Sequence, residues 1–133
     1  MSCSYGYLYK NTKGAKEQAE YGYEVLFDVI NWGREKGLDD PKSQLNKVME
    51  EVGEIAHEIT RNHYDLNELE QPDELVDAIG DTLVTVVILS DILGIDPISA
   101  LSEAYEQIKD RKGKTSNGTF VKEEDGEESN LQD

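Results

Sequence analysis

Two clusters of acidic residues in this chain have the types and spacing of a chemical site. The first cluster consists of Glu50, Glu51, Glu54 and Glu58, and the second consists of Glu74, Asp77 and Asp81. Residues three and four apart lie on one face of a helix, so each cluster presents several carboxylates together. Carboxylate oxygens are ligands that Mg²⁺ and Mn²⁺ prefer. If the two helices face each other, they form a site where a cation can bridge phosphate oxygens and activate a water.

Each cluster also has a simpler interpretation. The glutamates can form a solvated acidic helix face, since Glu favours helices. Asp81 is less easily explained, because it lies within an apolar run between Ile79 and Leu83. A buried, unpaired carboxylate is costly. It therefore either pairs with a cation such as Lys47 or Arg61, or it binds metal.

The elements that must position these residues are four predicted helices. Apolar periodicity predicts them at approximately residues 15–36, 41–62, 72–93 and 97–112. Asp40-Pro41 and Asp96-Pro97 are typical helix starts, whereas Gly37 and Gly94 are typical stops. We expect an all-α fold, a four-helix bundle occupying residues 15–121. An N-terminal arm (1–14) precedes it, residues 114–121 form a polar extension, and an acidic, disordered tail (122–133) follows.

The apolar residues of the two central helices predict how these helices pack. In the second helix they are Leu45, Val48, Met49, Val52, Ala56 and Ile59, and this stripe is expected to face a core. The third helix is apolar on nearly every side from residue 79 to residue 93, which predicts a central, buried helix. So apolar a helix in so small a chain needs a neighbouring subunit to cover it, and we expect a homodimer or homotetramer.

Charge and cysteine content narrow the function classes. The formal net charge is −16, from 29 acidic and 13 basic residues. Such a chain is not expected to bind nucleic acid directly or to bind an anionic membrane, and a phosphate-bearing substrate would need a divalent cation. The single cysteine, Cys3, cannot form an internal disulfide, and the N-terminus lacks the basic-then-apolar pattern of a signal peptide. We therefore expect a cytoplasmic protein.

Two motifs carry a resemblance to a known family. Glu50-Glu51-Val52-Gly53-Glu54 is an EExxE motif, and Glu74-Leu75-Val76-Asp77, followed by Gly80-Asp81, is similar to an ExxD motif on the next long helix. In their order and separation, over approximately residues 15–120, these motifs resemble the MazG-like all-α nucleotide pyrophosphohydrolases. The resemblance implies hydrolysis of a nucleoside triphosphate (NTP or dNTP) to the monophosphate and pyrophosphate, with Mg²⁺ as the cofactor and Mn²⁺ as a possible substitute.

The resemblance also implies roles for the acidic residues. Glu51 and Glu54 would ligate metal from the second helix, and Asp81, with Asp77 beside it, from the third. The commonest family pattern has Glu three residues before the Asp of the Gly-Asp pair, where this chain has Ala78. Either Glu74 and Asp77 are the true ExxD pair, or Asp77 and Asp81 act together. Glu50 is a further ligand or the general base that orients the attacking water.

Further candidates contact the substrate in this interpretation. Trp32, the only tryptophan, would stack on the base, although core packing explains it equally well. Lys47 would touch a phosphate, or form an ion pair one turn before Glu51. By resemblance, Arg111, Lys112 and Lys114 would lie near the triphosphate, unless they only complement the dipole at a helix end. His57, three residues after Glu54, is interpreted as a surface or supporting residue rather than a di-iron ligand.

Two other functions compete with this one. A phosphoribosyl-ATP pyrophosphohydrolase would share the helical fold and similar acidic motifs. An acidic binding protein that mimics nucleic acid would spread its carboxylates over the outer surface. The enzyme instead requires Asp77 and Asp81 to face Glu51 and Glu54, so the direction of these side chains separates the two classes.

Overall fold

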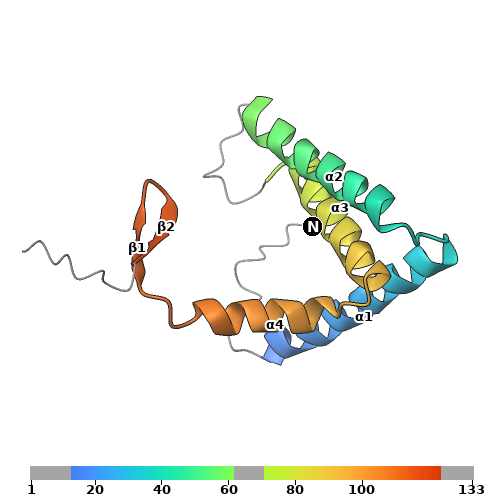
Figure 1. Ribbon diagram of the computed structural model, residues 1–133, viewed down its shortest axis with the longest axis horizontal. Helices are drawn as coiled ribbons and strands as arrows, with labels where there is room; N and C mark the ends of the chain where they lie inside the picture. Colours follow the sequence, from blue (N-terminus) through green and yellow to red (C-terminus); the bar gives the residue numbers. More distant parts are fainter. Residues whose placement is uncertain (1–12, 62–70, 124–133) are drawn as a thin grey trace, which may run out of the picture. The chain divides into compact units, whose positions relative to one another are not determined.

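The computed structural model describes residues 13–61 and 71–123, which are mostly helical (Figure 1). Its elements are α1 (Lys13–Glu35), α2 (Pro41–Arg61), α3 (Asp73–Ile92) and α4 (Pro97–Ile108), followed by β1 (Gly113–Ser116) and β2 (Thr119–Lys122). All four predicted helices are present, and the all-α prediction is confirmed. The predicted N-terminal arm and acidic tail fall almost entirely on residues 1–12 and 124–133, which lie outside the described residues.

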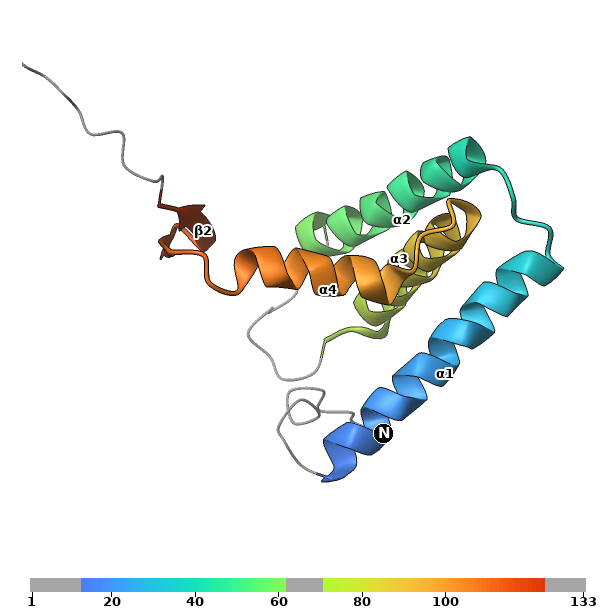
Figure 2. The ribbon, with the colours of Figure 1, turned by 60° about the horizontal axis from the view of Figure 1, so that its bottom comes forward.

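The chain divides into two compact units after Pro97. In the first unit, α3 packs against both α2 and α1 (Figure 2). Gln44, near the start of α2, contacts Thr85 in the second half of α3, whereas Glu51, later on α2, shares a pocket with Asp81, earlier on α3, so these two helices run antiparallel. The second unit contains α4 and the two strands. Every acidic residue of the two clusters belongs to the first unit.

Local signals in the sequence define the helix ends of the first unit. Gly37 and Gly94 have φ values of 70° and 69°, the left-handed conformation that glycine adopts without strain. After each glycine, the next backbone N–H donates back into the helix, from Leu38 to the Gly33 carbonyl and from Ile95 to the Ser90 carbonyl. Both ends are Schellman motifs. At the start of α2, the Asp40 carboxylate accepts a hydrogen bond from the Ser43 backbone N–H at 2.9 Å, the N-cap that Asp40-Pro41 predicts.

The core of the first unit is small and centres on α3. Its buried apolar residues are Leu75, Ala78 and Ile88. A Cβ atom added to Gly33 would lie 3.2 Å from Ile88 Cγ1, closer than ordinary van der Waals contact. The absence of a side chain at Gly33 therefore lets α1 approach α3, and this close approach sets the position of the neighbouring Trp32.

The outer faces of α2 and α3 differ from the sequence-based prediction. In α2 the predicted core stripe is exposed at Leu45, Met49, Val52, Ala56 and Ile59, and only Val48 is partly buried. The face turned toward α3 contains Gln44, Val48, Glu51 and Ile55 instead. In α3, one side is exposed at Val76, Ile79, Leu83 and Val86. The predictions that the α2 stripe faces a core and that α3 is buried on nearly all sides are therefore wrong within this chain.

Residues 113–122, predicted mainly as a polar extension, form a β-hairpin. Its register pairs Gly113 with Lys122 and Ser116 with Thr119. Asn117 and Gly118 form the two-residue loop with φ values of 50° and 75°, as a type I′ turn requires. The Asn-Gly dipeptide before Thr-Phe-Val was the available sequence signal. Helix α4 accordingly ends at Ile108, earlier than the predicted Lys112.

A helix can cross a bilayer only if it is long and apolar enough. Within residues 13–61 and 71–123, no single helix is long and apolar enough to cross a bilayer. Of the described helices, only α3 and α4 counted together reach the length and composition that a span requires.

Candidate functional site

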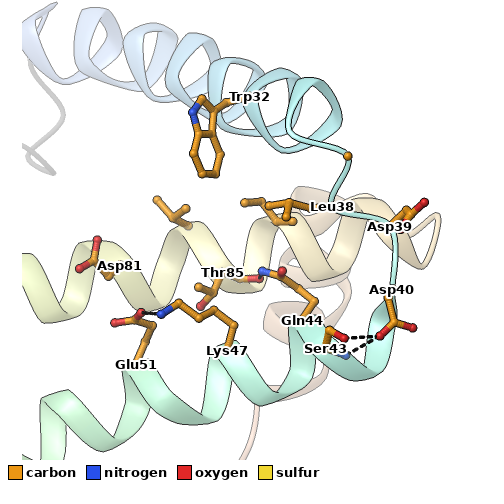
Figure 3. Close-up of a pocket in the computed structure, with 13 residues that line it drawn as sticks. Trp32, Leu38, Asp39, Asp40, Ser43, Gln44, Lys47, Glu51, Asp81 and Thr85 are labelled. Carbon is orange, nitrogen blue, oxygen red and sulfur yellow. Dashed lines mark hydrogen bonds and ion pairs between the residues drawn. The ribbon is translucent and has the colours of Figure 1, made fainter.

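A pocket of about 600 Å³ lies within the first unit, lined by α1, α2, α3 and the turn that joins α1 to α2 (Figure 3). This volume is within the range of small-molecule sites. The pocket has a charged end, formed by Lys47, Glu51 and Asp81, and an apolar wall formed by Trp32, Leu38, Val84 and Ile88. A charged end beside an aromatic wall suits a ligand that carries both an anionic group and a flat ring.

The charged end brings together carboxylates from both acidic clusters. Glu51 comes from α2 and Asp81 comes from α3, and both side chains line the pocket (Figure 3). The Glu51 side chain is only 12% exposed, whereas that of its neighbour Glu50 is 63% exposed. Asp81 is exposed to solvent, unlike Glu51, although it lines the same pocket. Within the EExxE motif, therefore, Glu51 is the residue that points inward.

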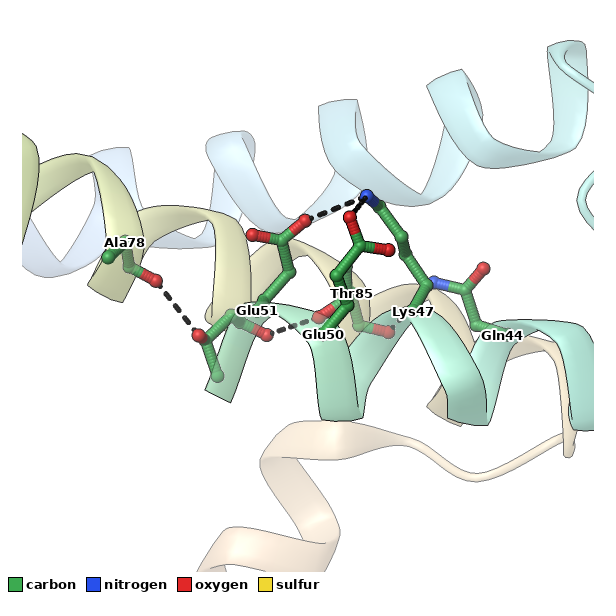
Figure 4. Close-up of polar contacts among 7 residues, drawn as sticks. Gln44, Lys47, Glu50, Glu51, Ala78 and Thr85 are labelled. Atoms are coloured by element: carbon green, nitrogen blue, oxygen red, sulfur yellow. Dashed lines mark hydrogen bonds and ion pairs between the residues drawn. The ribbon is translucent and has the colours of Figure 1, made fainter. Parts of the chain in front are cut away.

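Lys47 partly neutralises this acidic end. Its Nζ lies 3.0 Å from Glu51 Oε1, one turn later on α2, and 3.0 Å from Glu50 Oε1 (Figure 4). Hydrogen bonds to Glu50 and then to Glu51 raise the pKa of Lys47 above its usual value of 10.5. Lys47 is therefore protonated at neutral pH and places a positive charge beside the buried carboxylate. The ion pair predicted from the spacing is present.

The remaining predicted acidic residues do not line the pocket. Glu50, Glu54, Glu74 and Asp77 are exposed. Glu54 and Asp77 nevertheless occupy the next turn of α2 and α3 beyond Glu51 and Asp81. Because the two helices are antiparallel, both lie toward the same end of the helix pair. Among the described residues, no group of three or more His, Cys, Asp or Glu side chains is close enough to hold a metal ion.

The donor chemistry of the pocket still suits Mg²⁺. This cation is commonly held by one or two carboxylates, with waters and substrate phosphates completing its octahedral shell. Glu51 and Asp81 supply two carboxylates from facing helices, in a pocket that is open to solvent and ligand. They fit a cation that is bound together with a phosphate-bearing substrate better than one held by protein alone.

Two features position the apolar wall: the close approach of Gly33 to Ile88 and the turn at Gly37. Trp32 precedes Gly33, whose contact with Ile88 brings α1 close to α3. The indole projects from α1 toward α2 and α3 (Figure 3). Leu38 follows Gly37, and the Schellman motif directs the chain so that Leu38 reaches the pocket. Trp32 is thus a pocket residue and is 49% exposed, so simple core packing does not account for it.

Sequence reasoning missed the floor of the pocket. Gln44 is 7% exposed, and its Nε2 donates a hydrogen bond to the Thr85 carbonyl oxygen at 3.1 Å. Asp39, Asp40 and Ser43 also line the pocket, at the start of α2. The available signal was helical spacing, since Gln44, Lys47 and Glu51 follow one another at three and four residues on one face.

Other candidate residues lie outside the pocket. Arg111, Lys112 and Lys114 are exposed and belong to the second unit, around the start of β1. His57 is partly buried on α2 but does not line the pocket. Asp91 of α3 accepts hydrogen bonds from Arg34 Nε at 2.9 Å and from Nη2 at 2.6 Å, which ties α1 to α3. The hydrogen bonds from Arg34 are the main reason that the pKa of Asp91 lies below its usual value.

Comparisons with known proteins agree with these observations. A family model described as the MazG nucleotide pyrophosphohydrolase domain matches residues 39–116, more than half of the chain. A curated protein, the uncharacterized 18.2 kDa protein in the rep-hol intergenic region of Haemophilus phage HP1, is 31% identical over 78 residues. This match covers 56% of the present chain and 43% of the phage protein. No solved structure matches.

Proposed function

The chain belongs to the MazG nucleotide pyrophosphohydrolase domain family, and from this premise we propose that it hydrolyses an NTP or dNTP to the monophosphate and pyrophosphate. The observation that carries the proposal is the convergence of Glu51 and Asp81, from two facing helices, on one pocket that also contains Trp32. A nucleotide matches this arrangement, because its base is a flat ring and its phosphates are anions that bind a cation.

The charged end of the pocket is the place for the triphosphate. Glu51 and Asp81 would hold Mg²⁺, with Glu54 and Asp77 available one turn farther along, and Glu74 beyond them. When bound, the cation neutralises phosphate charge and lowers the pKa of a coordinated water. Without it, two carboxylates would repel the substrate.

Lys47 and Glu50 have complementary roles in this proposal. Lys47 is protonated and reaches the pocket, so its ammonium can donate a hydrogen bond to a phosphate oxygen once it leaves Glu51. Glu50 pairs with Lys47 in the structure and lies outside the pocket, so it could accept a proton from the attacking water only after turning toward the pocket.

The acidic-mimic alternative is less well supported. A mimic of nucleic acid requires its carboxylates on an outer surface, which fits the exposed Glu54 and Asp77. It does not account for Glu51, which is 12% exposed and lines a pocket together with Asp81. No feature of the described residues favours phosphoribosyl-ATP over a simple nucleotide. That compound therefore serves as one substrate in the test below.

We also propose that the protein works as a homodimer or homotetramer. The exposed stripe of α2 (Leu45, Met49, Val52, Ile59) and that of α3 (Val76, Ile79, Leu83, Val86) have the three- and four-residue spacing of packed helices. A second copy offers the same spacing, so two copies could pack these stripes against each other about a two-fold axis. Light scattering that finds only monomer at micromolar concentration would contradict this.

Pyrophosphate release measured over all common NTPs and dNTPs with Mg²⁺ tests the reaction. We expect wild-type protein to yield monophosphate and pyrophosphate, and Asp81→Asn to lose on the order of 100-fold or more in kcat. Asp28→Asn is the matched control, because Asp28 is exposed on α1 outside the pocket. If folded wild-type protein turned over no nucleotide, phosphoribosyl-ATP included, the proposal would be wrong.

A further inference from the structure

Gln44 has an arrangement that its role in packing does not explain. It is the most buried residue of α2, yet its side chain is polar. Its Nε2 donates to the Thr85 carbonyl oxygen, and a carbonyl accepts only from the NH₂ side of the amide (Figure 4). This hydrogen bond therefore assigns the orientation of the amide and identifies Oε1 as the remaining acceptor.

The acceptor Oε1 is left without a donor. Within the part of the chain that the structure describes, no hydrogen bond reaches it, although Gln44 lines the pocket. Oε1 is not fully buried, and Gln44 lines the pocket, so this acceptor is open to the pocket, where a ligand donor can replace water. The pocket thus presents a fixed hydrogen-bond acceptor that is available to a ligand.

The surroundings of Gln44 indicate which part of a nucleotide meets it. Trp32 projects from α1 across the pocket from Gln44 and Thr85, and Leu38 lies nearby (Figure 3). Lys47 and Glu51, on the following turns of the same face of α2, form the charged end. A base lying along the indole, with its phosphates toward Glu51, would bring its edge to Gln44.

We propose that this pocket selects nucleotides whose base carries an exocyclic amino group, with Gln44 Oε1 accepting the amino hydrogen. The proposal rests on the proposed function and specifies its substrate class. Gln44 is a specificity-determining residue in this scheme. Its hydrogen bond to Thr85 keeps the amide from turning over to offer Nε2 instead.

The selection follows from the hydrogen-bonding edges of the bases. Cytosine and adenine carry an amino donor where uracil and hypoxanthine carry a carbonyl oxygen. That oxygen would face Oε1 with no hydrogen between two acceptors, and both groups would lose their hydrogen bonds to water. A site built to hydrogen-bond a substrate group discriminates strongly against an analogue that lacks it.

The single tryptophan makes binding directly measurable. Trp32 is the only tryptophan of the chain and lines the pocket, so its fluorescence reports occupancy without any chemical step. The probes are nucleoside monophosphates, titrated with Mg²⁺ present: dCMP against dUMP, and AMP against IMP. The monophosphate of the 2-pyrimidinone nucleoside, which has neither an amino nor an oxo group at that position, completes the pyrimidine series.

We expect each amino-bearing nucleotide to bind at least about 10-fold more tightly than its oxo partner, with 2-pyrimidinone also weakened relative to dCMP. Gln44→Met keeps the length of the side chain but removes the acceptor, and should bring the dCMP/dUMP ratio to within about 2-fold. Asn46→Met, an exposed α2 position outside the pocket, is the matched control and should keep the wild-type ratio. Should Gln44→Met fail to fold, the wild-type series still tests the proposal.

The outcomes separate this inference from the proposed function. Equal affinities for amino and oxo nucleotides in the fluorescence titration would overturn the inference. The proposed pyrophosphate release would not be affected by that result. Absence of quenching alongside active pyrophosphate release would also overturn the inference, because the base would then bind elsewhere. Absence of both quenching and pyrophosphate release would contradict the inference and the proposed function together. A wild-type preference that Gln44→Met abolishes would support it.

Discussion

The two faces of α2 differ in polarity: the face toward α3 carries polar residues, and the opposite face carries exposed apolar residues. The face toward α3 presents Gln44 and Glu51, both largely shielded from solvent. The opposite face presents Leu45, Met49 and Val52, and Met49 is 62% exposed. A helix on the surface of a monomeric protein normally has the reverse distribution.

The contrast indicates that the two faces serve different purposes. Polar groups on the inner face surround a pocket, where a ligand and a cation can satisfy them. Apolar groups on the outer face are available for another helix pair. The inner face should therefore control binding and turnover, while the outer face should control assembly. The predictions below test whether the faces can be separated.

The largest effect is expected at the inner face. Glu51→Gln removes the charge of the most enclosed carboxylate in the motif and should lower kcat by about 100-fold or more. It should leave the molecular mass in solution unchanged, because the side chain faces the pocket. Steady-state kinetics and light scattering on the same sample check both points. A change in mass would mean that the two faces are coupled.

A charge on the outer face should produce the opposite pattern. Met49→Glu or Leu83→Glu places a carboxylate within the apolar stripe, at residues that are each 62% exposed in the single chain. We expect the oligomer to dissociate to half its mass or less, as measured by size-exclusion chromatography with light scattering. Asn46→Glu adds the same charge to α2 outside the stripe and should not alter the mass. Wild-type mass in both stripe variants would contradict an assembly role.

The next effect concerns the position of the aromatic wall. Gly33→Val would force α1 away from Ile88, since even a Cβ lies at 3.2 Å, and would move Trp32 relative to Gln44. We expect KM for the best nucleotide to rise about 10-fold with a smaller change in kcat. Gly22→Val is the matched control, because nothing lies within 4 Å of a Cβ at that position. Equal effects of the two variants would indicate helix propensity rather than packing.

The smallest effect should come from the ion pair that joins α1 to α3. Arg34 lowers the pKa of Asp91, so the stabilisation is complete above the usual value of 3.8 and is lost as pH falls through the lower folded-state pKa. Asp91→Asn should reduce Tm at pH 7 by only about 1–3 °C, because the pair is solvent-exposed. That difference should vanish at strongly acidic pH. If the Tm difference between wild type and Asp91→Asn stayed constant across the pH range, the ion pair with Arg34 would not be its cause.

The helix boundaries could be predicted from the sequence because local chemistry determines them. Gly37 and Gly94 adopt a conformation that other residues avoid, and Asp40 offers an oxygen to a free backbone N–H. The motif residues Glu51 and Asp81 were likewise recognisable by type and spacing. The hairpin at Asn117-Gly118 is equally local in origin, because this dipeptide favours the two-residue turn that it forms.

The direction in which each helix face points was decided only by the tertiary structure. Periodicity identifies the stripe Leu45-Met49-Val52 as apolar, but an apolar stripe can pack inside its own chain or against another. Contacts between residues distant in sequence, Gln44 with Thr85 and Gly33 with Ile88, set the rotation and approach of the helices. The sequence therefore determined which residues can do chemistry, while packing decided that Glu51 and Asp81 share a pocket with Gln44, because burial depends on neighbours that local backbone preferences do not specify.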